Sequence, residues 1–307
     1  MGLFHCPVGA PFYGDDDCIE CGMCLAKTKE EMVEASKTIR AYLQSRNENK
    51  SAIGKIAVTG KGGVGKSSVV ILLANALGRR GYRVLVLDTD ESNPGPYRML
   101  GFDQVPKPLL SLLSRFSPDE PDASAEWLAR ERIAIRDIPS EYVLSRNGLA
   151  LAMAGKIVDP FQGCACAMAD IARDLVAKLV LDDNELLLVD TEAGTESFGR
   201  GVERNVDTLL IVVEPSHESL ALAEKMGYMA QGMGITRVRA ILNKVASDSA
   251  RQRMMEELAK RKVEPIGVIH FDPQFSEAGF EGRPPGDSRA TADMDEIADR
   301  LLQPGAN

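Results

Sequence analysis

A glycine-rich segment is the clearest candidate for chemistry in this chain. Residues 60–67 read GKGGVGKS and match the spacing G-x-x-x-x-G-K-[ST], in which backbone N–H groups curl around phosphate oxygens. An apolar run precedes the segment and a helical pattern follows it, which is the context that the motif requires. We expect Lys66 to reach the β- and γ-phosphates of a nucleotide and the hydroxyl of Ser67 to bind Mg²⁺. The predicted phosphate-binding residues are Gly60, Lys61, Gly62, Gly63, Val64, Gly65, Lys66, Ser67 and Ser68.

Cysteines near the N-terminus form a second candidate site. Cys18, Cys21 and Cys24 have the C-x₂-C-x₂-C spacing of ferredoxin-like clusters. The usual fourth cysteine downstream is missing, and Cys6 is the candidate to replace it. Four thiolates suit either a 4Fe–4S cluster or a structural Zn²⁺. The compact spacing favours the cluster.

Two further cysteines form an isolated C-x-C pair. Cys164 and Cys166 cannot complete a tetrahedral metal site within one chain, because they supply only two thiolates. Two chains related by a two-fold axis would supply four. Thiolates are soft ligands that select Ni²⁺, Zn²⁺ or iron–sulfur over Mg²⁺. The alternative interpretation is a pair of buried cysteines that act as small hydrophobic side chains.

The composition limits the classes of partner. The chain has 307 residues, of which 44% are hydrophobic, so it can bury a sizeable core. Its formal net charge of −9 argues against non-specific binding to nucleic acid and against docking on an anionic membrane. The sequence has no apolar run long enough to span a bilayer and no pattern of a secretory signal at its start. We therefore expect a cytoplasmic protein with no nucleic-acid or membrane partner.

Apolar runs alternate with helical patterns along most of the chain. Buried strands are expected at 56–60, 83–90, 186–194, 208–215, 237–245 and 262–272, and helices at 67–78, 167–181, 218–233 and 249–261. The alternation predicts an α/β fold, in which helices cover both faces of a doubly wound, mostly parallel sheet. Residues 106–149 interrupt the pattern and are interpreted as an insertion of helices and loops. We assign residues 1–50 to a small Cys-rich extension with a helix at 29–46, and residues 51–307 to the main domain.

The lysine at position 61 makes the phosphate loop more specific. The pattern K-G-G-x-G-K-[ST] resembles the deviant Walker A signature of the MinD/ParA/nitrogenase-iron-protein class of P-loop NTPases. The resemblance implies a homodimer controlled by nucleotide, in which Lys61 reaches the nucleotide of the partner. It also implies that Asp90 orients the attacking water, that Asp88 assists at Mg²⁺ through water, and that Asn243 reads adenine. The segment that begins at Asp190 resembles Walker B and switch II, where a carboxylate at a strand end binds Mg²⁺ through its water shell.

A longer pattern narrows the resemblance. The C-x-C pair, a helix, VDTEAGxExxGRG at 189–201 and VDTLLIVVEP at 206–215 together resemble the CooC-type ATPases, over roughly residues 55–275. That resemblance implies ATP hydrolysis coupled to nickel insertion into carbon monoxide dehydrogenase. It also implies that Cys164 and Cys166 hold Ni²⁺ or Zn²⁺ across a dimer.

The leading hypothesis is therefore a homodimeric ATPase that loads metal into a carbon monoxide dehydrogenase-like client enzyme. Lys61, Lys66 and Asp90 are its expected catalytic residues, with ATP and Mg²⁺ as ligands. One alternative is an ATP-driven donor that passes electrons from an N-terminal iron–sulfur cluster to a partner metalloenzyme. The other is a positioning ATPase similar to MinD or ParA, with no metal chemistry.

Overall fold

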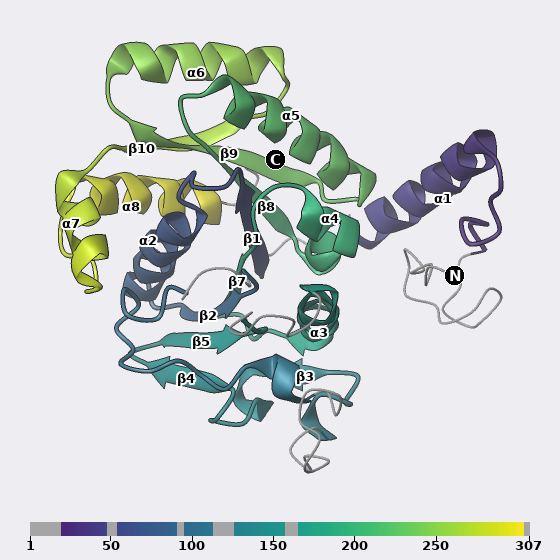
Figure 1. Cartoon of the computed structure of the whole chain (residues 1–307), viewed down its shortest axis with the longest axis horizontal. Coiled ribbons are helices and arrows are strands. Elements are labelled where there is room, and N and C mark those ends of the chain that lie inside the picture. The colour runs from purple at the N-terminus through teal and green to yellow at the C-terminus, as the bar shows by residue number, and fades with distance from the viewer. Residues whose placement is uncertain (1–19, 48–53, 91–94, 113–125, 157–164, 304–307) are drawn as a thin grey trace.

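The computed structural model describes residues 20–47, 54–90, 95–112, 126–156 and 165–303. At its centre is an eight-stranded sheet with the spatial order β10-β9-β8-β1-β7-β2-β5-β4 (Figure 1). Its strands are β1 (Lys55–Gly60), β2 (Arg83–Asp88), β4 (Val143–Arg146), β5 (Leu149–Met153), β7 (Glu185–Asp190), β8 (Thr208–Val213), β9 (Arg237–Val245) and β10 (Pro265–His270). Neighbouring strands are parallel except β4 and β5, which are antiparallel. The structure confirms the predicted α/β fold with a mostly parallel sheet.

Helices cover both faces of this sheet. The α-helices of the described residues are α1 (Lys29–Asn47), α2 (Lys66–Arg79), α3 (Ala165–Lys178), α4 (Glu196–Arg200), α5 (His217–Gly232), α6 (Asp248–Lys260), α7 (Pro273–Glu281) and α8 (Arg289–Leu302). Apolar residues of α3, α5 and α6 form one core cluster with the sheet, and those of α2 and α8 form the other. Figure 1 shows α2 and α8 side by side, as their contacts require.

The central strand β1 explains this two-sided burial. Side chains alternate along a strand, so Ala57 belongs to the cluster with α3, whereas Ile56 and Val58 belong to the cluster with α2. A strand buried on both faces is continuously apolar, as β1 is. Its neighbours are β7 and β8, which lie on opposite sides of it. The carboxyl ends of β1, β7 and β8 therefore meet at one edge of the sheet, where α/β folds bind ligands.

Two short strands lie in the region interpreted as an insertion of helices and loops. β4 extends the main sheet at one edge, and β3 (Ile133–Ala134) pairs with β6 (Leu179–Val180) in a separate two-stranded sheet. The buried rings of Trp127 and Tyr142 anchor this region, with centroids 6.2 Å apart. The sequence did not indicate these strands because segments of two and four residues are too short to show a periodicity.

Helix α1 stands apart from the layered core (Figure 1). It contacts α5, and Ala35 and Ile39 are the buried apolar residues within the part of α1 whose side chains are described. Met32 and Val33 on the same helix are exposed. The helix therefore holds the segment that carries Cys21 and Cys24 beside the ATPase core through a small contact.

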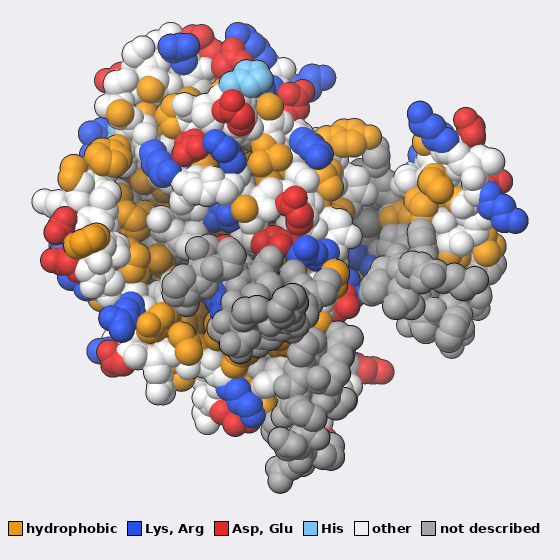
Figure 2. All heavy atoms as spheres, in the orientation of Figure 1, with side chains coloured by type: hydrophobic (Ala, Val, Ile, Leu, Met, Phe, Trp, Pro, Cys, Tyr) orange, Lys and Arg blue, Asp and Glu red, His pale blue; other side chains and the backbone are white. Residues whose placement is uncertain are grey.

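The surface carries charges of both signs. Figure 2 shows acidic and basic side chains interspersed on the face that it displays, with single apolar side chains between them. Scattered exposed apolar residues are normal for a folded protein. Within the described ranges, no helix combines the length and the apolar character needed to cross a bilayer.

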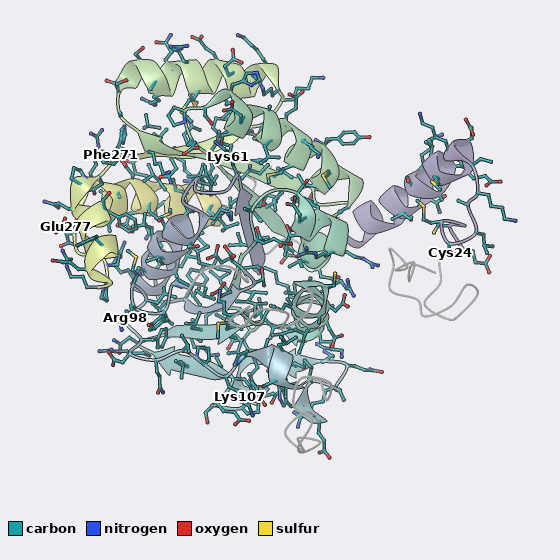
Figure 3. The ribbon with its side chains drawn as sticks, in the orientation of Figure 1. Cys24, Lys61, Arg98, Lys107, Phe271 and Glu277 are labelled. Carbon is teal, nitrogen blue, oxygen red and sulfur yellow. The ribbon has the colours of Figure 1, made fainter. Side chains whose placement is uncertain are left out.

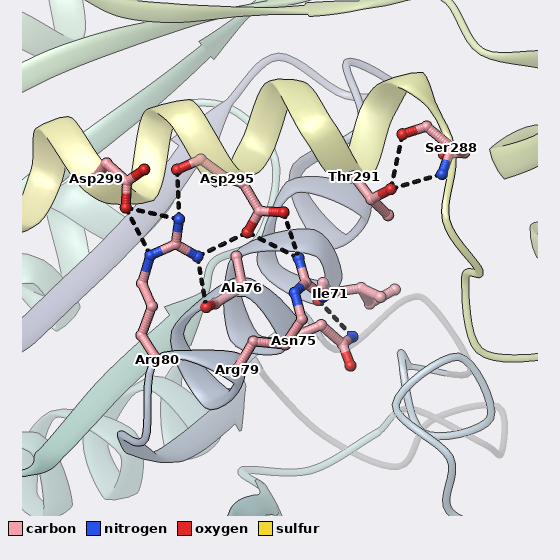
Figure 4. A network of polar contacts seen from close by, with 9 residues as sticks. All are labelled: Ile71, Asn75, Ala76, Arg79, Arg80, Ser288, Thr291, Asp295 and Asp299. Atoms are coloured by element: carbon pink, nitrogen blue, oxygen red, sulfur yellow. Dashed lines mark hydrogen bonds and ion pairs between the residues drawn. The ribbon is translucent and has the colours of Figure 1, made fainter.

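A network of ion pairs ties α8 to the end of α2 (Figure 4). Arg80 bonds to Asp295 at 2.6 Å and to Asp299 at 2.8 Å, and Arg79 bonds to Asp295 at 2.9 Å. Arg80 also donates to the carbonyl oxygens of Ala76 and Asp295, at 2.8 Å each. Burial alone would raise the pKa of Asp295, but the hydrogen bonds from Arg80 and Arg79 outweigh it and lower the pKa. The network fixes the helix that follows the phosphate loop.

We expect Arg80→Met to lower the free energy of unfolding by about 1–2 kcal/mol, because it removes several charge-assisted hydrogen bonds. Urea denaturation measures this value. Lys260→Met on α6 is the control, since it removes an exposed pair with Glu257 that water screens and that contributes little to stability. Equal losses in the two variants would show that the network contributes no more than an ordinary surface pair.

Candidate nucleotide-binding site

The predicted phosphate loop joins β1 to α2. Residues 60–65 connect the strand to the helix, and Ser67 and Ser68 lie in the first turn of α2. Gly63 and Gly65 have φ values of 76° and 97°, a left-handed conformation that glycine adopts without strain. A Cβ atom on Gly65 would lie 2.5 Å from the side-chain nitrogen of Asn243, so a larger residue would displace that side chain from its bond to Val64. Gly65 is the N-cap of α2 and has no side chain to bond the first N–H groups, which leaves them for phosphate oxygens.

Lys66 lies in the midst of carboxylates at the start of α2. Its side chain is buried, with 6% of the residue exposed. Burial lowers the pKa of Lys66, and the charges of Asp190, Asp90 and Glu192 oppose that shift. The ammonium group therefore sits among the acidic groups predicted to bind Mg²⁺ and water.

Asp190 is the best-defined candidate ligand for Mg²⁺. It ends β7, in register with Val58 of β1 and Asp88 of β2, and is 1% exposed. Burial and the charge of Asp88 raise its pKa to about 7, although the Ser67 hydroxyl lies close enough to lower it in part. Within the described residues, neither carboxylate oxygen accepts a well-formed hydrogen bond. A buried, unpaired carboxylate beside a serine hydroxyl fits a hydrated Mg²⁺ that arrives with the nucleotide.

Asp88 is held by a lysine that the sequence did not single out. The Lys156 ammonium lies 2.8 Å from Oδ2 of Asp88 and also donates to the carbonyl oxygen of Asp90. Burial raises the pKa of Asp88, and the charge and hydrogen bond of Lys156 counter it. The backbone N–H of Asp90 donates to Oδ1 of Asp88 at 3.1 Å. Asp88 and Asp90 are thus brought to the phosphate loop, while the residues that follow at 91–94 lie outside the described ranges.

Asn243 supports the loop from the end of β9. Its side-chain nitrogen donates to the carbonyl oxygen of Val64 at 2.8 Å, and the residue is buried. The structure therefore assigns it a contact with the loop itself. Its predicted contact with adenine stays a prediction.

Lys61 forms an ion pair within its own chain. Its ammonium lies 3.3 Å from Oε1 of Glu214, and the ammonium of Lys244 lies 3.2 Å from Oε2 of the same carboxylate. Lys244 also donates to the carbonyl oxygen of Gly63 at 2.6 Å. Burial alone would raise the pKa of Glu214, but the hydrogen bonds from Lys244 and Lys61 lower it. Figure 3 labels Lys61 on the loop between β1 and α2, where this pair forms.

The segment after Asp190 packs on the phosphate loop. The hydroxyl of Thr191 donates to the carbonyl oxygen of Val58 at 3.0 Å, and the N–H of Gly194 donates to that of Gly60 at 3.1 Å. Glu192 accepts two hydrogen bonds from Nη1 of Arg200, at 2.6 and 2.7 Å. The segment that resembles switch II therefore contacts the phosphate loop through the backbone of Gly194. It contacts α4 through the side chain of Glu192.

The structure describes half of the cysteines that were predicted to bind metal. Cys6, Cys18 and Cys164 lie outside the described residues. Cys21 is half-buried, Cys24 is exposed, and Cys166 is exposed in the first turn of α3. Figure 3 shows Cys24 far from Lys61, on the arm that carries α1. Within the described ranges, no three potential metal ligands gather, so both cysteine sites stay predictions.

Four residues of the site were missed in the sequence: Lys156, Glu214, Lys244 and Arg200. Lys156 and Glu214 each follow an apolar strand closely. Their positions at the carboxyl ends of strands could have indicated from the sequence that they lie near the ligand site. Lys244 has a φ of 56°, an uncommon conformation for a lysine that turns its side chain toward the loop. Only the folded structure shows that conformation.

We expect Asp190→Asn to stabilise the ligand-free protein above about pH 7 by a few kcal/mol. The folded-state pKa of Asp190 is raised, so the wild type loses stability as the pH rises from the unfolded-state value toward about 7. Mg²⁺ with a non-hydrolysable ATP analogue should offset this loss, and the increase in Tm should be larger at about pH 8 than at about pH 6. Thermal denaturation of both proteins at both pH values tests the expectation.

Glu203→Gln is the matched control for Asp190→Asn. Burial raises the pKa of Glu203 to about 7, so the variant should also be stabilised at high pH. It should keep the full effect of Mg²⁺ and nucleotide, because Glu203 bonds to Ser197 rather than facing the phosphate loop. An Asp190→Asn protein that retained the magnesium effect would contradict the assigned role.

Comparisons with known proteins agree with this geometry. A family model described as the CobQ/CobB/MinD/ParA nucleotide binding domain matches residues 55–285. An uncharacterized ATP-binding protein of Methanocaldococcus jannaschii is 36% identical over 251 residues, which cover 80% of this chain and 97% of that protein. The carbon monoxide dehydrogenase accessory protein CooC of Rhodospirillum rubrum is 36% identical over 207 residues, which cover 63% of this chain and 75% of CooC.

Solved structures show the same fold. The septum site-determining protein MinD of Pyrococcus horikoshii, complexed with Mg-ADP, superposes with a TM-score of 0.61 at 19% identity, over 81% of this chain and 96% of that one. The sequence similarity to CooC confirms the resemblance that the C-x-C and GRG patterns indicated. The chain therefore belongs to the CobQ/CobB/MinD/ParA nucleotide-binding family and is a P-loop ATPase with CooC among its relatives.

Proposed function

We propose that this chain is a dimeric ATPase that inserts nickel into a carbon monoxide dehydrogenase-like enzyme. The observation that carries the proposal is the position of Cys166, which is exposed in the first turn of α3. Later turns of the same helix pack on α4 and on the short helix η5 (Val202–Asn205), which follow the segment of Asp190. Helix α3 thus carries a candidate ligand for the cargo metal and also packs on the elements that follow the ATPase site. The name of the relative CooC, an accessory protein of carbon monoxide dehydrogenase, supports the client.

The cargo metal would be Ni²⁺ or Zn²⁺, held by Cys164 and Cys166. Two chains would supply four thiolates, which suits a tetrahedral site. Thiolates near the start of a helix also benefit from the positive end of the helix dipole. The dimer would bind or release the metal as nucleotide changes the arrangement of its subunits.

The nucleotide would control dimerisation through Lys61. ATP with Mg²⁺ would bring two subunits together, and Lys61 would leave Glu214 to reach the nucleotide of the partner. Lys66 would stabilise the charge on the phosphates, and Asp90 would orient the attacking water. We expect this cycle to take place in the cytoplasm, with neither nucleic acid nor membrane as a partner.

The N-terminal cysteines would hold a separate 4Fe–4S cluster or Zn²⁺. Cys24 lies in a turn in which the N–H of Leu25 donates to the carbonyl oxygen of Gly22 at 3.0 Å, and Cys21 precedes that turn. Glu20 and Gly22 have left-handed φ values of 51° and 79°. The turn leaves Cys24 exposed and Cys21 half-buried, which supports their role as accessible ligands. The rival function, an ATP-driven electron donor, would require a reducible cluster here whose potential shifts when nucleotide binds.

We expect the anaerobically purified protein to bind one Ni²⁺ or Zn²⁺ ion per two chains at the C-x-C pair, and Cys166→Ser to abolish this binding. Metal titration followed by elemental analysis measures the stoichiometry. Cys24→Ser is the control, which should lose metal or iron and sulfide from the N-terminal group and keep the shared ion. The proposal fails if Cys166→Ser binds nickel or zinc with the stoichiometry of the wild type.

We expect Glu214→Gln to increase dimerisation in the presence of Mg²⁺ and a non-hydrolysable ATP analogue by about 3–10-fold, because it frees Lys61 in both subunits from a partly exposed ion pair. Analytical ultracentrifugation measures the dimerisation constant. Glu296→Gln removes an exposed pair with Arg300 on α8 and should change nothing. A weaker or unchanged dimer in Glu214→Gln would show that the pair does not restrain Lys61.

A further inference from the structure

We infer that Arg173 of α3 is a positioning residue that couples the nucleotide-dependent segment of this ATPase to Cys166. The inference builds on the proposed function, because it assigns a route by which ATP could control the C-x-C pair.

Arg173 caps the C-terminus of α4. Its Nη1 donates to the carbonyl oxygen of Arg200, the last residue of α4, at 2.7 Å. The last carbonyls of a helix have no partner within the helix, and a cation there also meets the negative end of the helix dipole. Gly201 ends α4 with a left-handed φ of 74°, and a Cβ atom on it would lie 3.6 Å from Cδ of Arg173. The stem of Arg173 therefore packs against the residue at which α4 ends.

Arg200 connects the same helix to the ATPase site. Its guanidinium donates to both carboxylate oxygens of Glu192, at 2.6 and 2.7 Å. Glu192 is two residues beyond Asp190, is 9% exposed, and raises the pKa of Lys66 through its charge. Arg200 thus bonds to the Walker B segment through its side chain and to α3 through its carbonyl oxygen.

On α3, Arg173 and Cys166 lie on one stripe. Cys166, Asp170 and Arg173 are spaced i, i+4 and i+7, so they follow each other along one face of the helix. Nη2 of Arg173 donates to Oδ1 of Asp170 at 2.9 Å, which fixes the guanidinium to the turn next to Cys166. A helix moves nearly as a rigid element, so a shift at Arg173 displaces its first turn.

These contacts form a continuous route from Glu192 through Arg200 and Arg173 to α3. A ligand changes a distant site only when it interacts differently with two arrangements of such an element. The segment of Glu192 is the element that a γ-phosphate and Mg²⁺ would contact directly. Nucleotide should therefore alter the environment of Cys166, and the bond from Arg173 to α4 should be required for the change.

The chain offers a matched control on the same helix. Lys178 donates to the carbonyl oxygen of Leu128 at 2.9 Å and pairs with Asp174 at 2.7 Å. It therefore makes the same two kinds of contact as Arg173, one to a distant carbonyl and one to an aspartate of α3. Its distant partner does not belong to α4.

The test measures the alkylation rate of Cys166 by iodoacetamide in the full-length, metal-free protein, with mass spectrometric assignment of the site. We expect Mg²⁺ with a non-hydrolysable ATP analogue to change the wild-type rate by about 3–10-fold. Arg173→Met should reduce the ratio of the alkylation rates with and without nucleotide to about one, and Lys178→Met should leave this ratio unchanged. Arg173→Lys should restore part of the ratio, because an ammonium group can still donate to the Arg200 carbonyl.

Two outcomes would overturn the inference: an alkylation rate that does not respond to nucleotide in the wild type, or the same ratio in Arg173→Met. The second outcome would also be produced by dimer closure acting on Cys166 without the route through Arg173. If Arg173→Met does not fold, Glu192→Gln breaks the other end of the route and should flatten the ratio too. Nickel titration of the wild type is an independent test of the proposed function, which a protein that binds no metal would refute. The alkylation rates would still decide whether Arg173 couples nucleotide to Cys166.

Discussion

The site depends on the confinement of opposite charges at the carboxyl ends of β1, β2 and β7. Lys66, Asp88 and Asp190 are all buried there, and Asp190 has no hydrogen-bond partner among the described residues. An ionised carboxylate without a partner is costly in a medium of low dielectric constant, which is why the pKa of Asp190 rises to about 7. A cation bound with the nucleotide would remove that cost. The apolar strands and the glycine loop hold these groups together where water is scarce.

The loop keeps its shape through bonds from several strand ends. Asn243 and Lys244 lie near the end of β9, and their side chains donate hydrogen bonds to the carbonyl oxygens of Val64 and Gly63 respectively. Glu214, just beyond β8, joins Lys61 to Lys244. These bonds come from the ends of two neighbouring strands, β8 and β9, so the order of the sheet decides which side chains can reach the loop. The fold and the phosphate site are therefore determined by the same packing.

Local patterns in the sequence predicted the loop and the strand-end aspartates, because each is encoded within a few neighbouring residues. The alternation of apolar runs and helical patterns along the chain predicted the mostly parallel sheet. The ion pairs of Lys156 with Asp88 and of Glu214 with Lys61 join residues far apart in the chain, so no spacing could indicate them. Helix α7 was missed although its start is marked locally: the carboxylate of Asp272 accepts from two backbone N–H groups, and a proline follows. The short strands β3 and β4 had no comparable signal.

The position of β1 between β7 and β8 has a consequence for how the protein is made. β1 leaves the ribosome well before the residues that pair with it on both sides. Until then, both edges of the nascent strand are unpaired, and pairings between distant segments form slowly. The glycine loop therefore cannot complete its contacts before β7 and β8 have been synthesised. Nucleotide can therefore stabilise the loop only in the later steps of folding, once β7 and β8 have paired with β1.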